Sequence, residues 1–429
     1  MRIVMMTNTY LPHVGGVARS VETFSAALRK AGHEVKVVAP EFPDLPEAET
    51  DVLRVPALQR FNGSDFSVRL PVPGLLTEPL DRFQPDIIHA HHPFLLGDTA
   101  LRIASGRGLP IVFTHHTLYE QYTHYVPGES DALRRFIIDL STGYANLCDH
   151  VIAPSQSVAA LLQQRGVTTP LTVIPTGVNA ERFEAGEGAR FRLARGIPEN
   201  AFVVGHIGRL APEKNLLFLA QAAAAFLRQR SDAWFLVAGS GPLETEMKDL
   251  FASEGVSDRV RFAGILMGAE LADAYAAMDV FAFASQSETQ GMVLAEAMAA
   301  GTPVVAVDAS GVREVVQDGV NGRKVMVQDR DAFCAALDWV ADLPEDARGQ
   351  LSRQAHKTAR GMTIEGSTEK LATVYRSVIK KKAAWEIPED GPWQSASRFI
   401  ATEWKLLGSL AHAAGTALVG AEAHEGGPA

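Results

Sequence analysis

The sequence predicts an α/β fold with parallel sheets covered by helices, and it predicts two such domains in tandem. Short apolar runs alternate with stretches of helical periodicity, which is typical of parallel α/β proteins. Each run is almost continuously apolar, as expected for strands of a sheet that is buried on both faces. The alternation pauses after residue 178 and resumes at residue 201. A chain of 429 residues is long enough for two such domains.

The first domain is predicted to span residues 1–178. A helix is expected after its first apolar run, because Val17, Val21 and Phe24 fall on one stripe of a helical period. Gly32 is the expected end of that helix. The apolar runs of this domain are RIVMMTN (2–8), EVKVVAP (34–40), PDIIHAHH (85–92), LPIVFTHHT (109–117), DHVIAPS (149–155) and LTVIPTGV (171–178).

Residues 179–200 are polar and contain no clear strand, so they are predicted to form a linker. The second domain is predicted to span residues 201–370. Ligands of open parallel sheets bind at the carboxyl ends of the strands, so the two domains are expected to face a central cleft. The apolar runs of this domain are AFVVGHIGRL (201–210), AWFLVAGSG (233–241), RVRFAGIL (259–266), DVFAFAS (279–285) and TPVVAVDAS (302–310), and MVLAEAMAAG (292–301) is an expected helix.

The C-terminal part of the chain is predicted to be helical from about residue 345 to 382. Residues 371–429 are expected to form helices and a tail that pack back on the first domain, with disorder from residue 421. A contact of this tail with a membrane, through its apolar stripe and Lys380, Lys381 and Lys382, is the alternative. The stripe consists of Ile400, Trp404, Leu407, Ala411, Ala414 and Leu418, at spacings of four and three.

Composition excludes several classes of protein. The two cysteines, Cys148 and Cys334, exclude a disulfide framework and a zinc cysteine cluster, and they fit a reducing cytoplasm. No stretch of about 20 apolar residues is present, and the short N-terminal apolar run is interpreted as a strand and not as a signal peptide. A net charge of -10 argues against a general nucleic-acid binder.

The first domain carries two groups of candidate site residues. Gly15 and Gly16 directly precede a helix, where the backbone can approach a phosphate, although an ordinary strand–helix turn also needs glycine. They do not form a GxGxxG motif, which disfavours a nicotinamide dehydrogenase. Histidines end two adjacent runs, at 89, 91 and 92 and at 115 and 116. Hydrogen bonding by a strand-end histidine is favoured over a metal site, because alternate residues point to opposite faces of a strand.

The second domain carries cations and carboxylates after its strands. Arg209 and Lys214 lie in GRLAPEKN before a helix that is expected to start near Asn215, and they would suit a diphosphate. A solvated turn in which Glu213 neutralises a cation is the alternative. Glu288 and Glu296 flank a helix start at Met292 that Gly291 keeps open to an anion. Carboxylates accept hydrogen bonds from sugar hydroxyls, so this block favours a nucleotide sugar.

These motifs resemble those of glycosyltransferase family 4. The resemblance is carried, in this order, by GGVARS, HHT (115–117), PTGVNAERF (175–183), GRLAPEKN, VAGSGP, VRFAGIL and the Glu-x7-Glu pair, and it covers roughly residues 1 to 380. It implies the GT-B architecture of two Rossmann-like domains and a retaining, metal-independent transferase that uses a nucleotide sugar as co-substrate and no cofactor. HHPFLLG (91–97) and FTHHTLYEQYTHYVP (113–127) are similar to bacterial diacylglycerol glucosyltransferases.

The resemblance implies a role for each candidate residue. Arg209 and Lys214 would hold the leaving diphosphate, Glu296 the ribose and Glu288 the donor hexose. His116 would contact the donor sugar near the reacting carbon. Main-chain groups of the remaining donor-site residues would contact the phosphates, the sugar and the base. These residues are Gly15, Gly16, Gly239, Gly264, Ile265, Thr289, Gln290, Gly291 and Met292.

The acceptor is expected to bind on the first domain. Tyr119, Tyr122 and Tyr125 lead into a segment in which Arg134 and Arg135 precede apolar residues, and this segment could lie on an anionic membrane surface. A helix with one buried face and a solvated basic pair is the alternative. The subfamily resemblance favours UDP-glucose and a diacylglycerol acceptor in glycolipid synthesis, in the cytoplasm or peripherally on the inner face of the cytoplasmic membrane.

Three other functions stay open. One is a GDP-mannose-dependent mannosyltransferase acting on a phosphatidylinositol-type lipid or on a polysaccharide. The second is a catalytically silent protein that binds a nucleotide sugar. The third is a sugar phosphorylase, which would need a lysine-held pyridoxal phosphate site that the sequence does not reveal.

Overall fold

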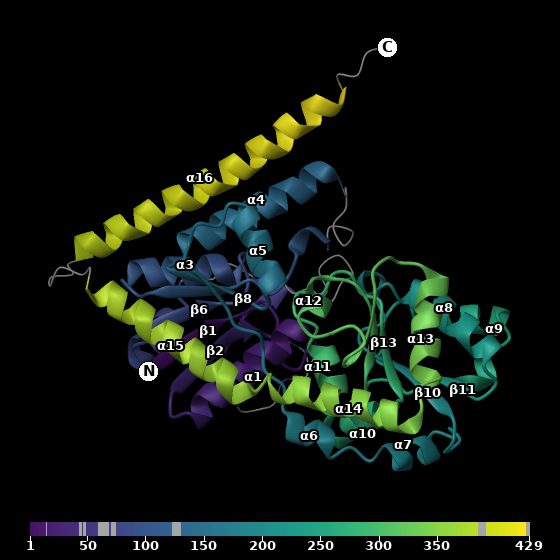
Figure 1. Cartoon of the computed structure of the whole chain (residues 1–429). Helices are drawn as coiled ribbons and strands as arrows, with labels where there is room; N and C mark the ends of the chain where they lie inside the picture. Colours follow the sequence, from purple (N-terminus) through teal and green to yellow (C-terminus); the bar gives the residue numbers. More distant parts are fainter. Residues whose placement is uncertain are drawn as a thin grey trace. The chain divides into compact units, whose positions relative to one another are not determined.

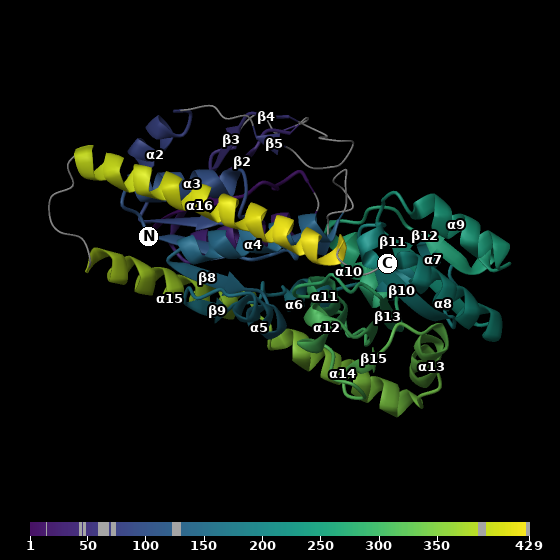
Figure 2. The same ribbon diagram turned by 90° about the horizontal axis from the view of Figure 1, so that it is seen from above.

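The computed structural model describes residues 1–13, 15–42, 45, 49–58, 68–69, 74–121, 130–384 and 392–425. The chain divides into two compact units. Unit 1 consists of Met1–Thr176 and Ser367–Ala429, and unit 2 consists of Gly177–Gly366. Each unit is built around one parallel sheet (Figures 1 and 2).

The sheet of unit 1 has the strand order β3-β2-β1-β6-β7-β8-β9, and every pairing in it is parallel. Helices α1 (Gly16–Lys30) and α15 (Ile364–Ala383) pack on one face of this sheet, whereas α3 (Leu96–Gly106), α4 (Asp131–Leu147) and α5 (Gln156–Gln164) pack on the other (Figure 1). The strands are β1 (Arg2–Met6), β2 (Glu34–Pro40), β3 (Val52–Val55), β6 (Ile87–Ala90), β7 (Ile111–Thr114), β8 (His150–Ala153) and β9 (Leu171–Val173).

The sheet of unit 2 has the order β12-β11-β10-β13-β14-β15 and is also parallel. Helices α8 (Leu216–Gln229), α9 (Glu244–Ser253) and α13 (Arg330–Ala341) cover one face. The other face is covered by α10 (Gly268–Ala276), α11 (Met292–Ala299), α12 (Ser310–Arg313) and α14 (Glu345–Arg360). The strands are β10 (Phe202–Ile207), β11 (Ala233–Ala238), β12 (Val260–Phe262), β13 (Val280–Phe283), β14 (Val304–Val307) and β15 (Gly322–Val325).

The prediction missed the edge strands β3 and β15 and the short antiparallel pair of β4 (Ala57–Leu58) and β5 (Val68–Arg69). It also missed α2 (Thr77–Phe83). Strand β15 has the sequence GRKV, in which Arg323 and Lys324 form ion pairs with Asp318 and Asp308. An edge strand can expose such side chains, so it lacks the apolar run by which buried strands are recognised.

The predicted linker is not a linker. Residues 179–200 contain α6 (Ala180–Glu184) and α7 (Gly188–Ala194), and both helices belong to unit 2. Phe183 and Phe191 are buried in the same apolar core as the inner face of α10. Helices of five and seven residues show too few turns for a periodicity to be recognised.

The C-terminal boundary lies a few residues earlier than predicted, at Gly366/Ser367. The expected helix over residues 345–382 is two helices, α14 and α15, which are separated at Gly361–Thr363. Helix α16 (Pro392–Glu425) lies along α3 and α4 within unit 1 (Figure 2). It continues through residues 421–425, for which disorder was expected.

Candidate active site

In each sheet the strand order reverses between two neighbouring strands. In open parallel sheets, the loops at the carboxyl ends of two such strands diverge, and ligands bind in the crevice between them. In unit 2 that point lies between β10 and β13. Residues 208–215 follow β10 and residues 284–291 follow β13. These are the two segments that contain Arg209, Lys214, Glu288 and Gly291.

Side chains join these two loops. Lys214 Nζ and a carboxylate oxygen of Glu288 form an ion pair in which both side chains are about four-fifths buried. Ser285 and Ser287 donate hydrogen bonds to the main-chain oxygen of Glu213 at 3.2 and 3.0 Å. Asn215, in the left-handed region at φ 55°, donates from Nδ2 to Ala284 O at 3.2 Å. The contact between Lys214 and Glu288 was not predicted, since the sequence assigned them to different parts of the donor.

Arg209 lies at the start of the β10 loop, where its Nη1 is 3.9 Å from Glu213 Oε1. The Arg209 side chain is 34% exposed, whereas the Glu213 side chain is only 4% exposed. This is the pairing of Glu213 with a cation that the sequence leaves open as an alternative. The guanidinium is thus anchored on one side and accessible on another, so it could still contact a diphosphate.

Glu296 lies in α11, the helix that follows the β13 loop, and it is 4% exposed. Its Oε2 accepts a hydrogen bond from the hydroxyl of the fully buried Tyr275 in α10 at 2.9 Å. Helix α11 begins after Gly291, which has φ 72°. A Cβ at Gly291 would lie 3.0 Å from Gly311 O, so the helix start needs glycine both for its φ and for space.

The loops after β11 and β12 lie next to the β10 loop. Gly239 N donates to Gly264 O at 2.7 Å, and a Cβ at Gly239 would collide with Gly208 O. Ile265 follows Gly264 and is 59% exposed. Most of the predicted donor residues of unit 2 therefore lie in loops at one edge of one sheet, whereas Met292 and Glu296 lie in α11.

His206, in β10, is a buried residue of this edge that the sequence interpretation did not select. Its Nδ1 lies 3.1 Å from Ala282 O, so Nδ1 carries the proton and Nε2 is a bare acceptor. Burial lowers the pKa of His206 to about 4. A histidine within an apolar run gives no signal of its own, because core histidines occur in such runs as well.

In unit 1 the strand order reverses between β1 and β6. Gly15 and Gly16 stand at the start of α1 after β1, as predicted. No atom lies within 4 Å of a Cβ placed on Gly16, so the backbone at this helix start is open. The segment after β6 is tied to this loop, because Asn8 N donates to His92 Nδ1 at 3.1 Å.

The strand-end histidines of β6 and β7 converge, as predicted from the adjacency of the strands. His91 Nδ1 and His116 Nε2 share a hydrogen bond of 2.9 Å. His89 lies between Tyr375, at 2.6 Å, and Thr114, at 2.7 Å. Burial lowers the pKa of His89 to about 3 and places the pKa of His91 and of His116 well below the usual value of 6.5. These side chains are therefore neutral at physiological pH, and they act as hydrogen-bonding groups.

Within the described part of the chain, no group of three or more His, Cys, Asp or Glu side chains is arranged to hold a metal ion. His91 points toward His116 and not toward a carboxylate. The histidines of this cluster are joined to neighbouring side chains by hydrogen bonds.

Three of the five predicted acceptor residues are described. Tyr119 packs edge-on against Phe94 and His115, with ring centroids 5.2 and 5.7 Å away. Arg134 lies 3.9 Å from Asp131 in the first turn of α4. The side chain of Arg135 is half-buried. Tyr122 and Tyr125 lie outside the described residues.

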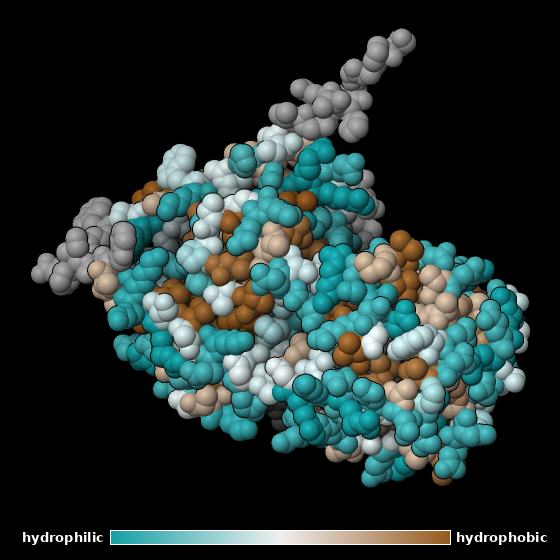
Figure 3. All heavy atoms as spheres, viewed as in Figure 1, coloured by the Kyte–Doolittle hydropathy of each residue, from teal (hydrophilic) through white to brown (hydrophobic). Residues whose placement is uncertain are grey.

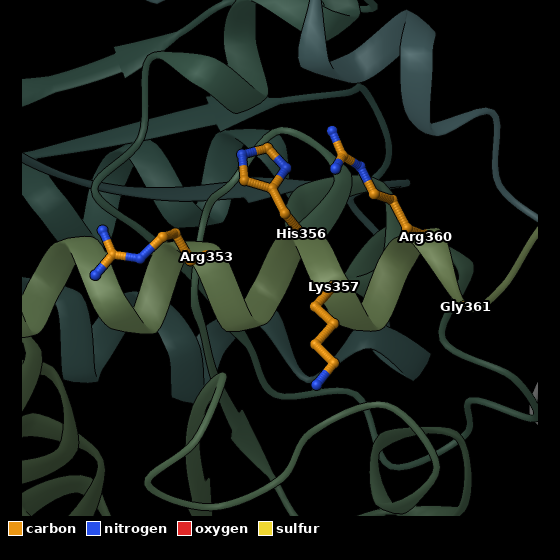
Figure 4. A pocket seen from close by; sticks show the side chains of 5 residues that line it. All are labelled: Arg353, His356, Lys357, Arg360 and Gly361. Atoms are coloured by element: carbon orange, nitrogen blue, oxygen red, sulfur yellow. The ribbon is translucent and has the colours of Figure 1, made fainter.

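A cavity of about 520 Å³ lies at α14. It is lined by Arg353, His356, Lys357, Arg360 and Gly361 (Figure 4). Arg360 is held by both carboxylate oxygens of Glu184, at 2.7 and 2.9 Å, and Lys357 points away from His356 (Figure 4). None of the predicted site residues lines this cavity.

Comparison with known proteins agrees with this arrangement of two units. Residues 14–182 match the model for Glycosyltransferase Family 4, and residues 189–358 match the model for Glycosyl transferases group 1. The chain is 31% identical over 363 residues to an alpha-monoglucosyldiacylglycerol synthase of Streptococcus pneumoniae (strain ATCC BAA-255 / R6), covering 83% of this chain and 82% of that protein. It is 29% identical over 389 residues to a GDP-mannose-dependent alpha-mannosyltransferase of Corynebacterium glutamicum, covering 88% and 89%.

The fold is also similar to that of solved glycosyltransferases. Sucrose-phosphate synthase from Thermosynechococcus elongatus superimposes with a TM-score of 0.73 at 21% identity, covering 88% of this chain and 99% of that one. Two parallel-sheet α/β units and these matches identify the GT-B fold. The chain belongs to glycosyltransferase family 4 and is a hexosyltransferase.

Proposed function

We propose that this protein transfers glucose from UDP-glucose, with retention of configuration, to a lipid acceptor such as diacylglycerol. The observation that carries this proposal is the gathering of Arg209, Lys214, Glu288 and Glu296 at the reversal point of one sheet. Two cations suit a diphosphate and two carboxylates suit sugar hydroxyls. The choice of glucose and of a lipid rests on the similarity to the synthase of S. pneumoniae.

The reaction we propose breaks the bond between the anomeric carbon and the phosphate oxygen. A bond from that carbon to the acceptor hydroxyl oxygen forms on the same face, and the acceptor proton passes to the departing phosphate oxygen. Negative charge grows on the diphosphate as the bond breaks, so Arg209, Lys214 and the start of α11 would stabilise the transition state more than the ground state. Lys214 must first exchange Glu288 for the phosphate, which would release Glu288 to accept hydroxyl hydrogens of the hexose.

His116 is proposed to contact the donor sugar near the anomeric carbon. Its neutral state suits this position, since a positively charged imidazolium would repel the positive charge that develops on the sugar. The resemblance to the family implies that no metal takes part. The charge of the diphosphate would be neutralised by Arg209, Lys214 and main-chain N–H groups of the loop at residues 289–292.

The first experiment is a thermal-shift panel with UDP, UDP-glucose, GDP and GDP-mannose. A ligand that binds only the native state raises its stability by about 2.7 kcal/mol at one hundred times its Kd. We expect a shift with the uridine compounds, and we expect Glu296→Ala to abolish it. An unchanged shift in Glu296→Ala would remove this glutamate from the donor site.

The second experiment measures transfer of labelled glucose to diacylglycerol in detergent micelles. The second candidate function is a mannosyltransferase that acts on a phosphatidylinositol-type lipid or on a polysaccharide, and the similarity to the C. glutamicum enzyme supports it. A thermal shift with GDP-mannose alone would favour this candidate. Donor binding without transfer to any of these acceptors would contradict the proposed enzyme activity.

A further inference from the structure

Helix α16 has an inner face that is fixed to unit 1 by specific contacts. Thr402 Oγ1 donates to Ser105 Oγ at 2.6 Å, and Glu403 forms an ion pair with Arg102, both on α3. Toward its C-terminal end, Thr416 donates to a carboxylate oxygen of Asp139 on α4. Because these contacts are spread along the helix, they determine which side of α16 faces outward.

The outward side of α16 carries a row of large apolar side chains. Ile400 is 56% exposed, Trp404 71%, Leu407 55% and Leu410 45%. Their spacing of four, three and three residues places them on one side of a helix. We call these four residues the outer row. Smaller exposed residues at 408, 411, 414 and 415 extend the same side without a charge.

The outer row is the largest group of exposed large apolar side chains on a single helix in the described part of the chain. Most of the surface in Figure 3 is hydrophilic. Four of the eleven large apolar side chains that are exposed in the described part of the chain belong to this one helix. Contiguous exposed apolar side chains on a soluble domain indicate an interaction surface.

The structure assigns the outer row to a lipid bilayer surface. This inference rests on the proposed function, because a lipid acceptor such as diacylglycerol resides in a bilayer. A helix with one apolar and one anchored face would lie in the plane of the interface, with its apolar side chains among the headgroups and upper acyl chains. Trp404, the most exposed of the four, has the amphipathic ring that favours this region.

The charges in this part of α16 fit a bilayer that contains anionic lipids. The chain as a whole has a net charge of -10. Between residues 397 and 417 the charged side chains are Arg398, Glu403 and Lys405, and the one carboxylate is neutralised by Arg102. This stretch is therefore locally cationic, and it could approach anionic headgroups that the rest of the chain would repel.

The helix would lie on the membrane and would not cross it. None of the described helices is long and apolar enough to span a bilayer. The inner face of α16 carries Thr402, Ser409 and Thr416, whose hydroxyls lie toward α3 and α4. Binding would thus leave the fold of unit 1 unchanged and would hold it at the surface where the acceptor resides.

The test compares the full-length protein with the variant Ile400→Gln/Trp404→Gln/Leu407→Gln. Sedimentation with phosphatidylcholine vesicles, with and without phosphatidylglycerol, measures binding. We expect the unaltered protein to pellet with the phosphatidylglycerol vesicles and the variant to bind at least about tenfold more weakly, since loss of one buried large apolar side chain already reaches that factor. The matched control is Leu193→Gln, which removes an apolar side chain that is 83% exposed in unit 2 and should not change binding.

Two further measurements separate the outcomes. Because the outer row is exposed, the triple variant should keep the melting temperature of the unaltered protein. If its melting temperature falls, the single variant Trp404→Glu replaces it in the vesicle experiment. Transfer to diacylglycerol in detergent micelles should be unchanged in the variant, whereas transfer to diacylglycerol in vesicles should fall. No transfer in micelles by the unaltered protein would contradict the proposed function, whatever the vesicle result.

Equal pelleting of the variant and the unaltered protein would overturn the inference. The inference would also be overturned if the unaltered protein pelleted with neither type of vesicle. A change of the variant from dimer to monomer in analytical ultracentrifugation, without a change in vesicle binding, would assign the outer row to an interface between copies of this chain.

Discussion

Glu296 is positioned by a hydrogen bond that no motif contains. Its partner, Tyr275, lies 21 positions earlier in another helix and is fully buried. The carboxylate was predicted because it follows a strand and a glycine-opened helix start, which are local features. The tyrosine depends on how α10 packs beside α11, and a tertiary contact of this kind leaves no periodic signal in the sequence.

Tyr275→Phe should weaken donor binding. Without the hydroxyl, Glu296 loses the hydrogen bond that Tyr275 donates to Oε2 and can turn away from the position proposed for the ribose. We expect the KM for the donor to rise roughly tenfold, equivalent to one hydrogen bond to a charged group, with a smaller change in kcat. Steady-state kinetics with the labelled donor measures both. The matched control is Tyr144→Phe, which removes a buried hydroxyl that donates to Gly97 O in unit 1; an equal rise in KM there would contradict the specific role.

His91 is predicted to position His116. The hydrogen bond between their rings determines which nitrogen of His116 carries the proton. We expect His91→Phe to lower kcat by about tenfold with little change in the donor KM, because one hydrogen bond that orients His116 is lost. His91→Asn keeps an amide group near the position of Nδ1 that can either donate or accept a hydrogen bond, so it should restore most of the activity. Equal activity of the two variants would contradict the positioning role.

His115 makes the stability of unit 1 depend on pH. Burial, and then the charge of Arg165, lower its pKa to about 4. Below pH 6.5 the unfolded chain binds a proton that the folded chain does not, so stability falls by about 1.4 kcal/mol per pH unit for this group down to about pH 4.

The variant His115→Phe should remove that part of the dependence. Urea unfolding at several pH values between 6.5 and 4 is expected to give a shallower loss of free energy of unfolding than in the unaltered protein. At pH values above 6.5 the two proteins should show the same slope, because the imidazole is neutral in both states there. Parallel curves over the whole range would contradict the assignment.

At the scale of the elements, the buried strands and the helices beside the site were predicted well. The loops after β10 and β13 and the helix starts near Asn215 and Met292 follow from apolar runs and from single glycines, which are local signals. The ion pair of Lys214 with Glu288 was not predictable in the same way. It depends on β10 and β13 being neighbours, and the sequence does not encode strand order directly.

Two glycines with nearly the same backbone angle allow the cost of the α11 start to be measured. Gly291 has φ 72° and Gly264 has φ 71°. A Cβ on Gly264 meets nothing within 4 Å, whereas on Gly291 it meets Leu294 Cδ1 at 2.9 Å and Gly311 O at 3.0 Å. We expect Gly264→Ala to cost about 1 kcal/mol of stability from its backbone angle alone.

Gly291→Ala should cost about 1 kcal/mol or more beyond that value, because the methyl group also presses against a main-chain oxygen and a core leucine. Denaturant unfolding of both variants measures the difference. An equal loss in the two would mean that the segment around Gly311 moves aside and that Gly291 is needed only for its angle.

At the scale of the molecule, the two units differ in what should destabilise or stabilise them. Unit 1 contains the buried His89, His91, His92 and His115, each with a pKa lowered by burial, whereas unit 2 contains His206 as its one buried histidine among the described residues. Acid should therefore act mainly on unit 1. The proposed UDP contacts lie chiefly in unit 2, so a nucleotide should act mainly on that unit.

Calorimetry at falling pH, with and without UDP, tests this division. We expect two transitions to separate as the pH drops from 6.5 toward 4, with the one that moves to lower temperature belonging to unit 1. UDP at about one hundred times its Kd should raise the other transition by roughly 5 to 11 °C, from about 2.7 kcal/mol of linkage in a unit of this size. Hydrogen exchange followed by mass spectrometry assigns each transition to its residues. A UDP shift confined to the acid-sensitive transition would contradict the placement of the donor site in unit 2, because linkage stabilises only the unit that holds the ligand.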